Sequence, residues 1–212
     1  KTDLFEEAYG KDALLDALAG LYPVVIGMDI SHVVAHAAMR RMMGPKYVVN
    51  DTCDLPFKDA SIDLAVFSCN GISMVGHDDR LAIMREVHRV LKPQGVFLFT
   101  TYNRNSPEAN AGFCFPEFEA SPNPARLLVR SIRHLRDTTI SVVQRLRHVR
   151  HEVHTPEYAV INDKCHNHGV MLYYITLAQQ RRQLQAAGFD ANALAYDCAG
   201  QRIVDDTTLD SM

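Results

Sequence analysis

Residues 24–31 read VVIGMDIS, a short and almost uninterrupted apolar run that ends at Asp29. An apolar run of this length is typical of a parallel strand that is covered on both faces. Ser31 can cap a helix that follows at once and reaches Met43, with Gly44 as its stop signal. The stretch therefore predicts a strand, a tight turn and a helix in immediate succession.

The same alternation of strands and helices continues to Thr101. Three further apolar runs are predicted as strands, at residues 47–49, 64–67 and 96–99. A helix that begins at Asp78 or Asp79 is predicted before the last of these strands. Strands separated by helices of about ten to fifteen residues require right-handed crossovers and a parallel sheet. We therefore expect an α/β, Rossmann-like, mostly parallel sheet flanked by helices. Such a sheet binds ligands at the carboxyl ends of its strands.

Residues 106–170 break this rhythm. Three prolines between residues 116 and 124 mark a loop, residues 124–136 predict a basic amphipathic helix, and residues 151–169 are polar and rich in histidine. The alternating pattern resumes with a helix opened by Thr176. We predict a Rossmann-like core formed by residues 1–105 and 171–212, into which a helical and β cap for the substrate is inserted at residues 106–170.

Composition places the chain among ordinary globular proteins. It has 212 residues, of which 47% are hydrophobic and 22% charged, with a net charge of −3. These values exclude a disordered or fibrous chain and argue against wholesale nucleic-acid binding. The sequence shows neither an apolar run of about 20 residues, which a membrane span would need, nor a secretory signal. Its five cysteines contain no C-x-x-C pair, so free thiols are favoured over a zinc site, and we expect a cytoplasmic protein without a metal.

One segment departs from this acidic average. Between Arg126 and His151 the sequence has seven arginines against one acid, Asp137. Three interpretations stay open: a solvated face of a cap helix, attraction of an anionic small substrate, or contact with RNA. Leu128, Ile132 and Leu135 lie one turn apart, so this helix is expected to bury one side against the core or against a second subunit in a homo-oligomer.

An acid at the end of the second strand has a clear physical use. The carboxylate of Asp29 can accept hydrogen bonds from both hydroxyls of a ribose, each charge-assisted and contributing about 1.5–3 kcal/mol. The alternative is that Asp29 only caps the following helix.

Four segments in this order and spacing together resemble the class I S-adenosylmethionine-dependent methyltransferases, in particular those that act on small molecules. The family pattern is roughly V-D-x-S, then D-x-x-x-L-P-F-x-D-x-S-F-D, then L-K-P-G-G. This chain has MDIS at residues 28–31, DTCDLPFKDASID at residues 51–63 and LKPQG at residues 91–95, followed by the strand to Thr101. It departs at Ile62 and Gln94.

The resemblance implies a role for individual residues. Asp29 would bind the ribose hydroxyls, Ile30 would pack on adenine, Asp51 would accept from the adenine amino group, and Thr52 would meet the ring edge. Further along the chain, Ser68 and Cys69 would line the methionine end of S-adenosylmethionine, and Asn70 and Tyr102 would face the acceptor. Where the acceptor must lose a proton, the candidate bases are His77 and Tyr102 near the strand ends and four histidines of the cap, and His77 is the favoured one. The cap histidines are His151, His154, His166 and His168.

One part of the family pattern is not found. The first strand and its glycine loop should precede residue 13, yet residues 1–10 look polar and helical. We therefore expect that residues are missing between Asp12 and Ala13, and that a final antiparallel strand lies beyond Met212.

The function implied is in-line methyl transfer from S-adenosylmethionine to a small-molecule acceptor. No motif identifies the acceptor or whether its reacting atom is oxygen, nitrogen or carbon. Two alternatives stay open: a nicotinamide-dependent dehydrogenase, which shares the acid after the second strand, and a non-catalytic regulator or scaffold that has kept the fold.

Overall fold

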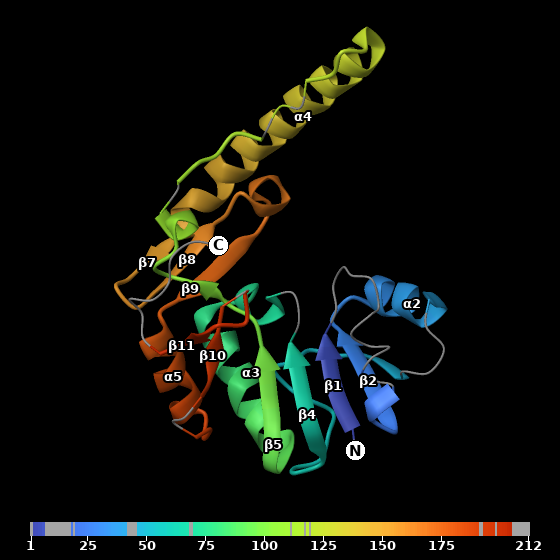
Figure 1. The fold of residues 1–212 in the computed structure, drawn as a ribbon, viewed down its shortest axis with the longest axis vertical. Helices are drawn as coiled ribbons and strands as arrows, with labels where there is room; N and C mark the ends of the chain where they lie inside the picture. The colour runs from blue at the N-terminus through green and yellow to red at the C-terminus, as the bar shows by residue number, and fades with distance from the viewer. Residues whose placement is uncertain are drawn as a thin grey trace. The chain divides into compact units, whose positions relative to one another are not determined.

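The computed structural model forms two compact units, and each is described by itself (Figure 1). The first unit comprises Lys1–Thr101 and Arg181–Ala193, and the second comprises Tyr102–Gln180 and Leu194–Met212. The predicted limits of the cap, residues 106 and 170, both lie inside the second unit. The residues that the structure describes are 2–6, 18, 20–41, 46–67, 70–110, 112–116, 118, 120–190, 193–197 and 199–204.

A five-stranded, fully parallel sheet forms the centre of the first unit, with the strand order β3-β2-β1-β4-β5. Its strands are β1 (Thr2–Glu6), β2 (Val24–Asp29), β3 (Lys46–Val49), β4 (Ile62–Phe67) and β5 (Leu91–Phe99). In the described part of the chain, helix α2 (His32–Arg41) lies between β2 and β3, and helix α3 (His77–Val90) lies between β4 and β5. The α/β, Rossmann-like sheet predicted from the sequence is confirmed.

The expectation that the first strand is missing is wrong. β1 lies in the middle of the sheet, where Leu4 is in register with Ile26 of β2 on one side and with Ala65 of β4 on the other. A strand paired along both edges is held by main-chain hydrogen bonds, so it forms even where its sequence, TDLFE, lacks an apolar run. The expected gap between Asp12 and Ala13, the glycine loop and the region beyond Met212 all lie outside the described residues.

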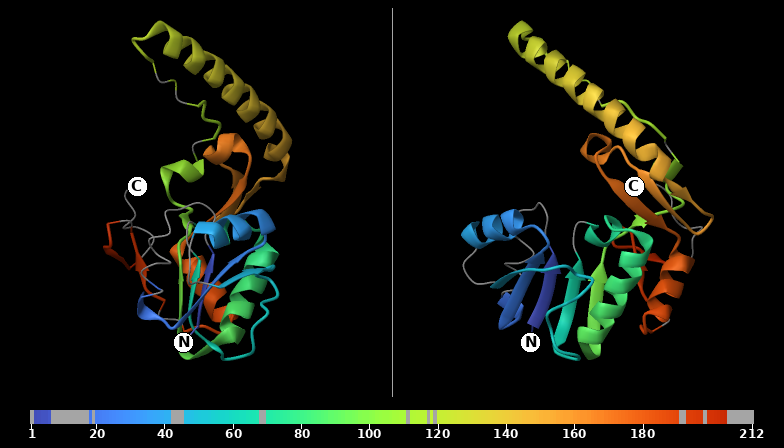
Figure 2. Two further views of the ribbon diagram at one scale, coloured as in Figure 1. Left: turned by 90° about the vertical axis from the view of Figure 1, so that its right-hand side faces the viewer. Right: turned by 180° about the vertical axis from the view of Figure 1, so that it is seen from behind.

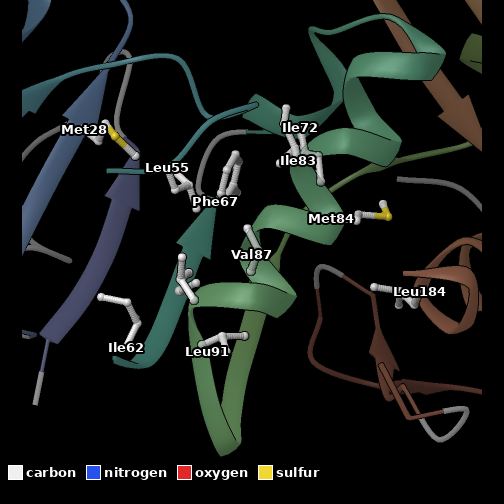
Figure 3. Close-up of a cluster of buried hydrophobic side chains, with 12 residues drawn as sticks. Met28, Leu55, Ile62, Phe67, Ile72, Ile83, Met84, Val87, Leu91 and Leu184 are labelled. Carbon is white, nitrogen blue, oxygen red and sulfur yellow. The ribbon is translucent and has the colours of Figure 1, made fainter. Parts of the chain in front are cut away.

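Helix α3 supplies much of the core of the first unit. Its apolar face is fully buried, because Ile83, Val87 and Val90 recur at helical spacing and pack into the core. Phe67 of β4 and Leu55 pack into the same cluster, which Figure 3 shows between the sheet and the helices. Burial of a large apolar side chain contributes about 1.5–3 kcal/mol, so this cluster is a main source of stability.

The second unit is built on a four-stranded sheet of order β6-β9-β8-β7. The strands are β6 (Tyr102–Asn103), β7 (Val153–His154), β8 (Tyr158–Asn162) and β9 (Met171–Ile175). β8 pairs antiparallel with β7 and β9, while β6 is parallel to β9. A short antiparallel ribbon, β10 (Ala195–Tyr196) with β11 (Arg202–Ile203), completes the described strands.

A single long helix, α4 (Pro124–His148), accompanies this sheet and is longer than the predicted segment 124–136. Asn123 caps it, because its side-chain oxygen accepts from the backbone N–H of Ala125 at 3.0 Å and of Arg126 at 3.2 Å. Pro124 stands at the first helical position, where a missing N–H costs nothing. Within the described part of the chain, α4 included, no helix combines the length and the apolar character that crossing a bilayer requires.

The remaining helices are short. They are α5 (Leu177–Ala186) and four 3-10 turns, η1 (Gly71–Ser73), η2 (Pro107–Asn110), η3 (Val149–His151) and η4 (Cys165–His168).

Candidate active site

The carboxyl ends of β2 and β3 lie side by side. Asp29, the last residue of β2, is in register with Val49 of β3, and the Asn50 N–H donates to the Asp29 carbonyl at 3.2 Å. Asp51 is the next residue of that chain segment. The two acids expected to hold one adenosine therefore lie at the ends of neighbouring strands on the same edge of the sheet, Asp29 as the last residue of β2 and Asp51 in the loop after β3.

Asp29 performs a local structural task with one carboxylate oxygen. Its Oδ1 accepts from the backbone N–H of Ser31 at 2.7 Å, which turns the chain from β2 into α2. Its Oδ2 accepts no hydrogen bond from any residue that the structure describes. Because a carboxylate has about four acceptor positions, the capping role leaves Asp29 able to bind a ribose as well.

Ile30 follows Asp29 and is unusually open for a large apolar residue. Its side chain is 72% exposed. An isoleucine in this position offers an apolar surface beside a carboxylate. A flat ring of a ligand can pack on the isoleucine, while neighbouring hydroxyl groups of the same ligand can donate to the carboxylate.

The loop after β3 is held together by its own polar groups. The Asn50 side-chain amide donates to the carbonyls of Asp51 at 2.7 Å and Asp54 at 2.5 Å, and Asp51 Oδ1 accepts from the Cys53 N–H at 2.9 Å. The Asp51 side chain stays exposed, and Thr52 is half-buried in the turn. Burial raises the pKa of the Cys53 thiol to about 11, with a further contribution from Asp51, so the thiol is protonated at neutral pH.

Two residues of α3 fix the segment Leu55–Phe57 that continues this loop. Arg89 donates to the Leu55 carbonyl at 3.0 Å and to the Phe57 carbonyl at 2.9 Å, while Glu86 Oε2 accepts from the Leu55 N–H at 3.0 Å. Arg89 also pairs with Glu86 at 2.7 Å and with Asp59 at 2.7 Å. The loop that carries Asp51 is therefore attached to a core helix.

We expect Glu86→Gln to remove a stabilisation that depends on pH. Hydrogen bonds from Arg89 hold the pKa of Glu86 below its usual 4.5, and the Leu55 N–H adds to them against the opposing effect of burial. A carboxyl with a lowered folded-state pKa stabilises the fold fully above its unfolded pKa and loses that contribution as pH falls through the folded one. The variant should lose about 1–2 kcal/mol of unfolding free energy at pH 7, and the difference from wild type should shrink below pH 4.5.

Urea unfolding followed by circular dichroism between pH 7 and pH 3 measures this difference. Asp54→Asn is the matched control, since the Asp54 side chain is exposed on the same loop. A constant gap between wild type and Glu86→Gln across that range would contradict the role assigned to the ionised carboxylate.

The residues predicted at the acceptor end are divided between the units. Asn70 begins η1 in the left-handed conformation, with φ 58°, and its N–H donates to Thr100 Oγ1 at 2.9 Å. His77 is the first residue of α3 and is half-buried. Tyr102 belongs to β6 of the second unit, where its ring lies 5.1 Å from that of Tyr174. Ser68 and Cys69 lie outside the described residues.

Arg80 is a residue that the sequence pattern did not single out. It lies on α3 and has no exposed surface. Its guanidinium donates to the Ile72 carbonyl at 2.6 Å, to Thr101 Oγ1 at 3.2 Å and to Gln183 Oε1 at 3.3 Å. It therefore joins η1, the chain after β5 and α5, which are three segments far apart in the sequence.

The second unit contains a polar cavity of about 270 Å³. It is lined by Glu108, Ala109, Asn110, Gly112, Cys114, Arg145, Glu152, His154, Ile161, Asn162, Asp163 and Lys164. Of the cap histidines considered as bases, His154 lies on this lining, and its Nε2 is 3.4 Å from Glu152 Oε2.

Two buried groups give the cavity its chemistry. Glu152 pairs with Arg145 and accepts from the Asn162 N–H at 2.9 Å; burial works to raise the pKa of Glu152, but these hydrogen bonds outweigh it and lower that pKa. The Asn162 side-chain amide donates to the carbonyls of His168 at 2.7 Å and Val170 at 3.0 Å, which fixes its orientation. Its Oδ1 is buried and accepts nothing from the described residues. This oxygen is enclosed by the surrounding protein and is not exposed to the cavity.

Comparison with known proteins gives the class. Residues 6–99 match the family model described as a methyltransferase domain. Malonyl-[acyl-carrier protein] O-methyltransferase 1 from Coxiella burnetii is 38% identical over 78 residues, which cover 37% of this chain and 25% of that protein. A probable S-adenosylmethionine-dependent methyltransferase from Mycolicibacterium smegmatis is 33% identical over 106 residues, which cover 48% of this chain and 38% of that protein.

Solved structures extend the match beyond the methyltransferase domain. An S-adenosylmethionine-dependent methyltransferase from Methanosarcina mazei has a TM-score of 0.55 over 95% of this chain and 87% of that one, at 19% identity. At this identity the match concerns the fold.

The family match and these relatives support a methyltransferase domain, and the resemblance to S-adenosylmethionine-dependent methyltransferases predicted from the sequence is confirmed. The domain lies within residues 6–99, and the cofactor of its class is S-adenosylmethionine. The chain spans about a quarter to two fifths of the length of the curated relatives described above.

Proposed function

We propose that this protein binds S-adenosylmethionine at the carboxyl edge of the five-stranded sheet and transfers its methyl group to a small polar acceptor. The observation that carries the proposal is that Asp29 ends β2 and Asp51 follows the end of the adjacent strand β3, with the hydrogen bond from the Asn50 N–H to the Asp29 carbonyl joining the two strand ends. Neither acid has both of its carboxylate oxygens engaged by the described residues.

The residues at this edge fit an adenosine group. Asp29 Oδ2 is open for the ribose hydroxyls, the exposed Ile30 side chain offers an apolar surface for adenine, and the exposed Asp51 can accept from the adenine amino group. Thr52 would meet the ring edge, while Ser68 and Cys69 are proposed at the methionine end by the family resemblance.

The chemistry sets the demands on the rest of the site. The sulfonium group of S-adenosylmethionine supplies an electrophilic methyl group, which a nucleophile attacks in line. The protein contributes mainly by holding the nucleophile about 3 Å from that methyl at the correct angle. Asn70 is proposed to contact the acceptor and His77 to accept its proton where one is lost.

The second unit is proposed to bind a small polar ligand in its own cavity. This cavity of about 270 Å³ is large enough for a small metabolite, and its lining includes the carboxylates of Glu152 and Asp163. These groups favour a ligand that donates hydrogen bonds, such as an amine, amide or alcohol. Tyr102 is proposed as a further contact.

Two measurements on the full chain test the function. Isothermal titration with S-adenosylhomocysteine should show one site, and incubation with methyl-labelled S-adenosylmethionine and a panel of small amines, amides and alcohols should label one class of acceptor. Binding without any labelled acceptor favours a regulator that has kept the fold. Heat with NADH but none with S-adenosylhomocysteine overturns the proposal in favour of a dehydrogenase.

A further inference from the structure

Helix α4 exposes a continuous apolar stripe, named here the α4 stripe. Its members alternate in spacing by four and three residues: Leu128, Ile132, Leu135, Thr139, Val142, Leu146 and, directly after the helix, Val149. Four side chains of the stripe are 61–71% exposed: Leu128, Ile132, Leu135 and Leu146. Contiguous apolar surface of this kind marks an interaction site.

The opposite side of α4, rather than the stripe, faces its own unit. Ser141 is 1% exposed, the Phe118 ring lies 5.2 Å from His134, and Arg130 donates to the Ala120 carbonyl at 2.8 Å. Figure 2 shows the segment before α4 running back along the helix on that side. The helix therefore packs with polar residues inward and apolar residues outward, the reverse of an ordinary surface helix.

The spacing of the stripe identifies the shape of its occupant. A 4-3-4-3 alternation has a period of 3.5 residues, which is the period of a seam between two supercoiled helices. Thr139 does not interrupt this seam, because its hydroxyl donates to the Leu135 carbonyl at 2.8 Å within the helix. A helix that lies on a lipid surface has no need of a strict 3.5-residue spacing.

The same stripe is complementary to itself. In an antiparallel pair centred on residue 137, Leu128 meets Leu146, Ile132 meets Val142, and Leu135 meets Thr139 of the other copy, so each layer joins two residues of the stripe. Such an arrangement satisfies the two-fold symmetry of a dimer.

The charges of α4 are compatible with this pairing. Arg126 and Arg133 are exposed and occupy heptad positions away from the seam, where they remain solvated in a dimer, while Arg130 is held by the Ala120 carbonyl of its own unit. Arg136 is closer to the seam and is neutralised by Asp137 at 2.8 Å.

We propose that the α4 stripe is the seam of an antiparallel coiled coil between two copies of this chain. The dimer is independent of the methyl-transfer proposal and is tested without any substrate. On this proposal, the function of the basic amphipathic helix α4 is self-association.

Sedimentation equilibrium of the full chain gives the primary test. Wild type should have twice the chain mass of 23.8 kDa at micromolar concentrations. The double variant Ile132→Glu with Leu146→Glu should raise the dimer Kd at least about a hundredfold, because it places unpaired charges in the seam. Arg133→Glu, which introduces the same charge away from the seam, should stay dimeric, and circular dichroism should show unchanged helix content in each variant.

Disulfide trapping tests the direction of the pair. A mixture of Leu128→Cys and Leu146→Cys chains should form a mixed disulfide that neither chain forms alone. Cross-linking of either chain with itself would overturn the antiparallel arrangement. A monomeric wild type overturns the dimer, and a monomer that co-sediments with vesicles of anionic phospholipid assigns the stripe to a membrane surface.

Discussion

Replacing Asp29 by asparagine is expected to weaken the binding of S-adenosylhomocysteine about ten- to a hundredfold. Because the single side-chain oxygen of asparagine stays on the Ser31 N–H, an NH2 group, which cannot accept, would replace the carboxylate oxygen Oδ2 that is proposed to bind the ribose hydroxyls; a hydrogen bond to a charged group contributes about 1.5–3 kcal/mol. A loss of about 1.4 kcal/mol corresponds to a tenfold change in Kd. Isothermal titration of wild type and variant measures this change directly.

The design of this variant separates ligand binding from folding. Asparagine retains an oxygen that can accept from the Ser31 N–H, so the entry into α2 and the melting temperature should be preserved. Asp54→Asn removes the same charge from a neighbouring exposed position and should leave the affinity unchanged. Equal weakening by both variants would indicate a general electrostatic effect and would remove Asp29 from the proposed site.

The parts of the fold that could be predicted from the sequence are those with a regular local pattern. β2 is a short apolar run that ends at an acid, and α3 repeats its buried residues at helical spacing. The edge that carries Asp29 and Asp51 follows from these elements, because the ends of successive parallel strands meet at one side of a sheet.

β1 was missed because a central strand does not need an apolar sequence of its own. In TDLFE only Leu4 and Phe5 are apolar, and its place is set by pairing with β2 and β4, which lie about twenty and sixty residues further along the chain. No local pattern reports such long-range pairing.

The cavity and Arg80 were missed for a related reason. Three polar residues of the cavity come from different segments: Arg145 from α4, Glu152 from the chain just before β7, and Asn162 from β8. Within its own segment, none of them has a sequence context that predicts a buried polar group. An arginine within an amphipathic helix predicts a solvated side chain, and only the folded structure brings the carbonyl of Ile72 and the side chains of Thr101 and Gln183 around Arg80. Buried polar groups are defined by partners that the sequence does not place together.

Arg80→Met is expected to lower the free energy of unfolding by about 2–5 kcal/mol. Methionine keeps an unbranched side chain in the same space but removes every donor, so the Ile72 carbonyl, Thr101 Oγ1 and Gln183 Oε1 lose their bonds to the guanidinium. A buried acceptor left unpaired costs about 1–3 kcal/mol. The total stays below three full penalties, because Thr101 Oγ1 is also 2.9 Å from Ser73 Oγ and keeps that hydrogen bond.

Urea unfolding followed by circular dichroism measures the loss as a lower midpoint at an unchanged slope. Arg85→Met, at an exposed position of the same helix, should change the free energy by less than about 0.5 kcal/mol. Arg80→Lys should fall between wild type and Arg80→Met, since an ammonium group can donate to some of the three acceptors but cannot match the planar fork that reaches all of them. If Arg80→Met were as stable as Arg85→Met, the guanidinium would not be what holds together η1, α5 and the chain after β5. The packing of Ile72 and Ile83 alone would then have to hold these segments in place.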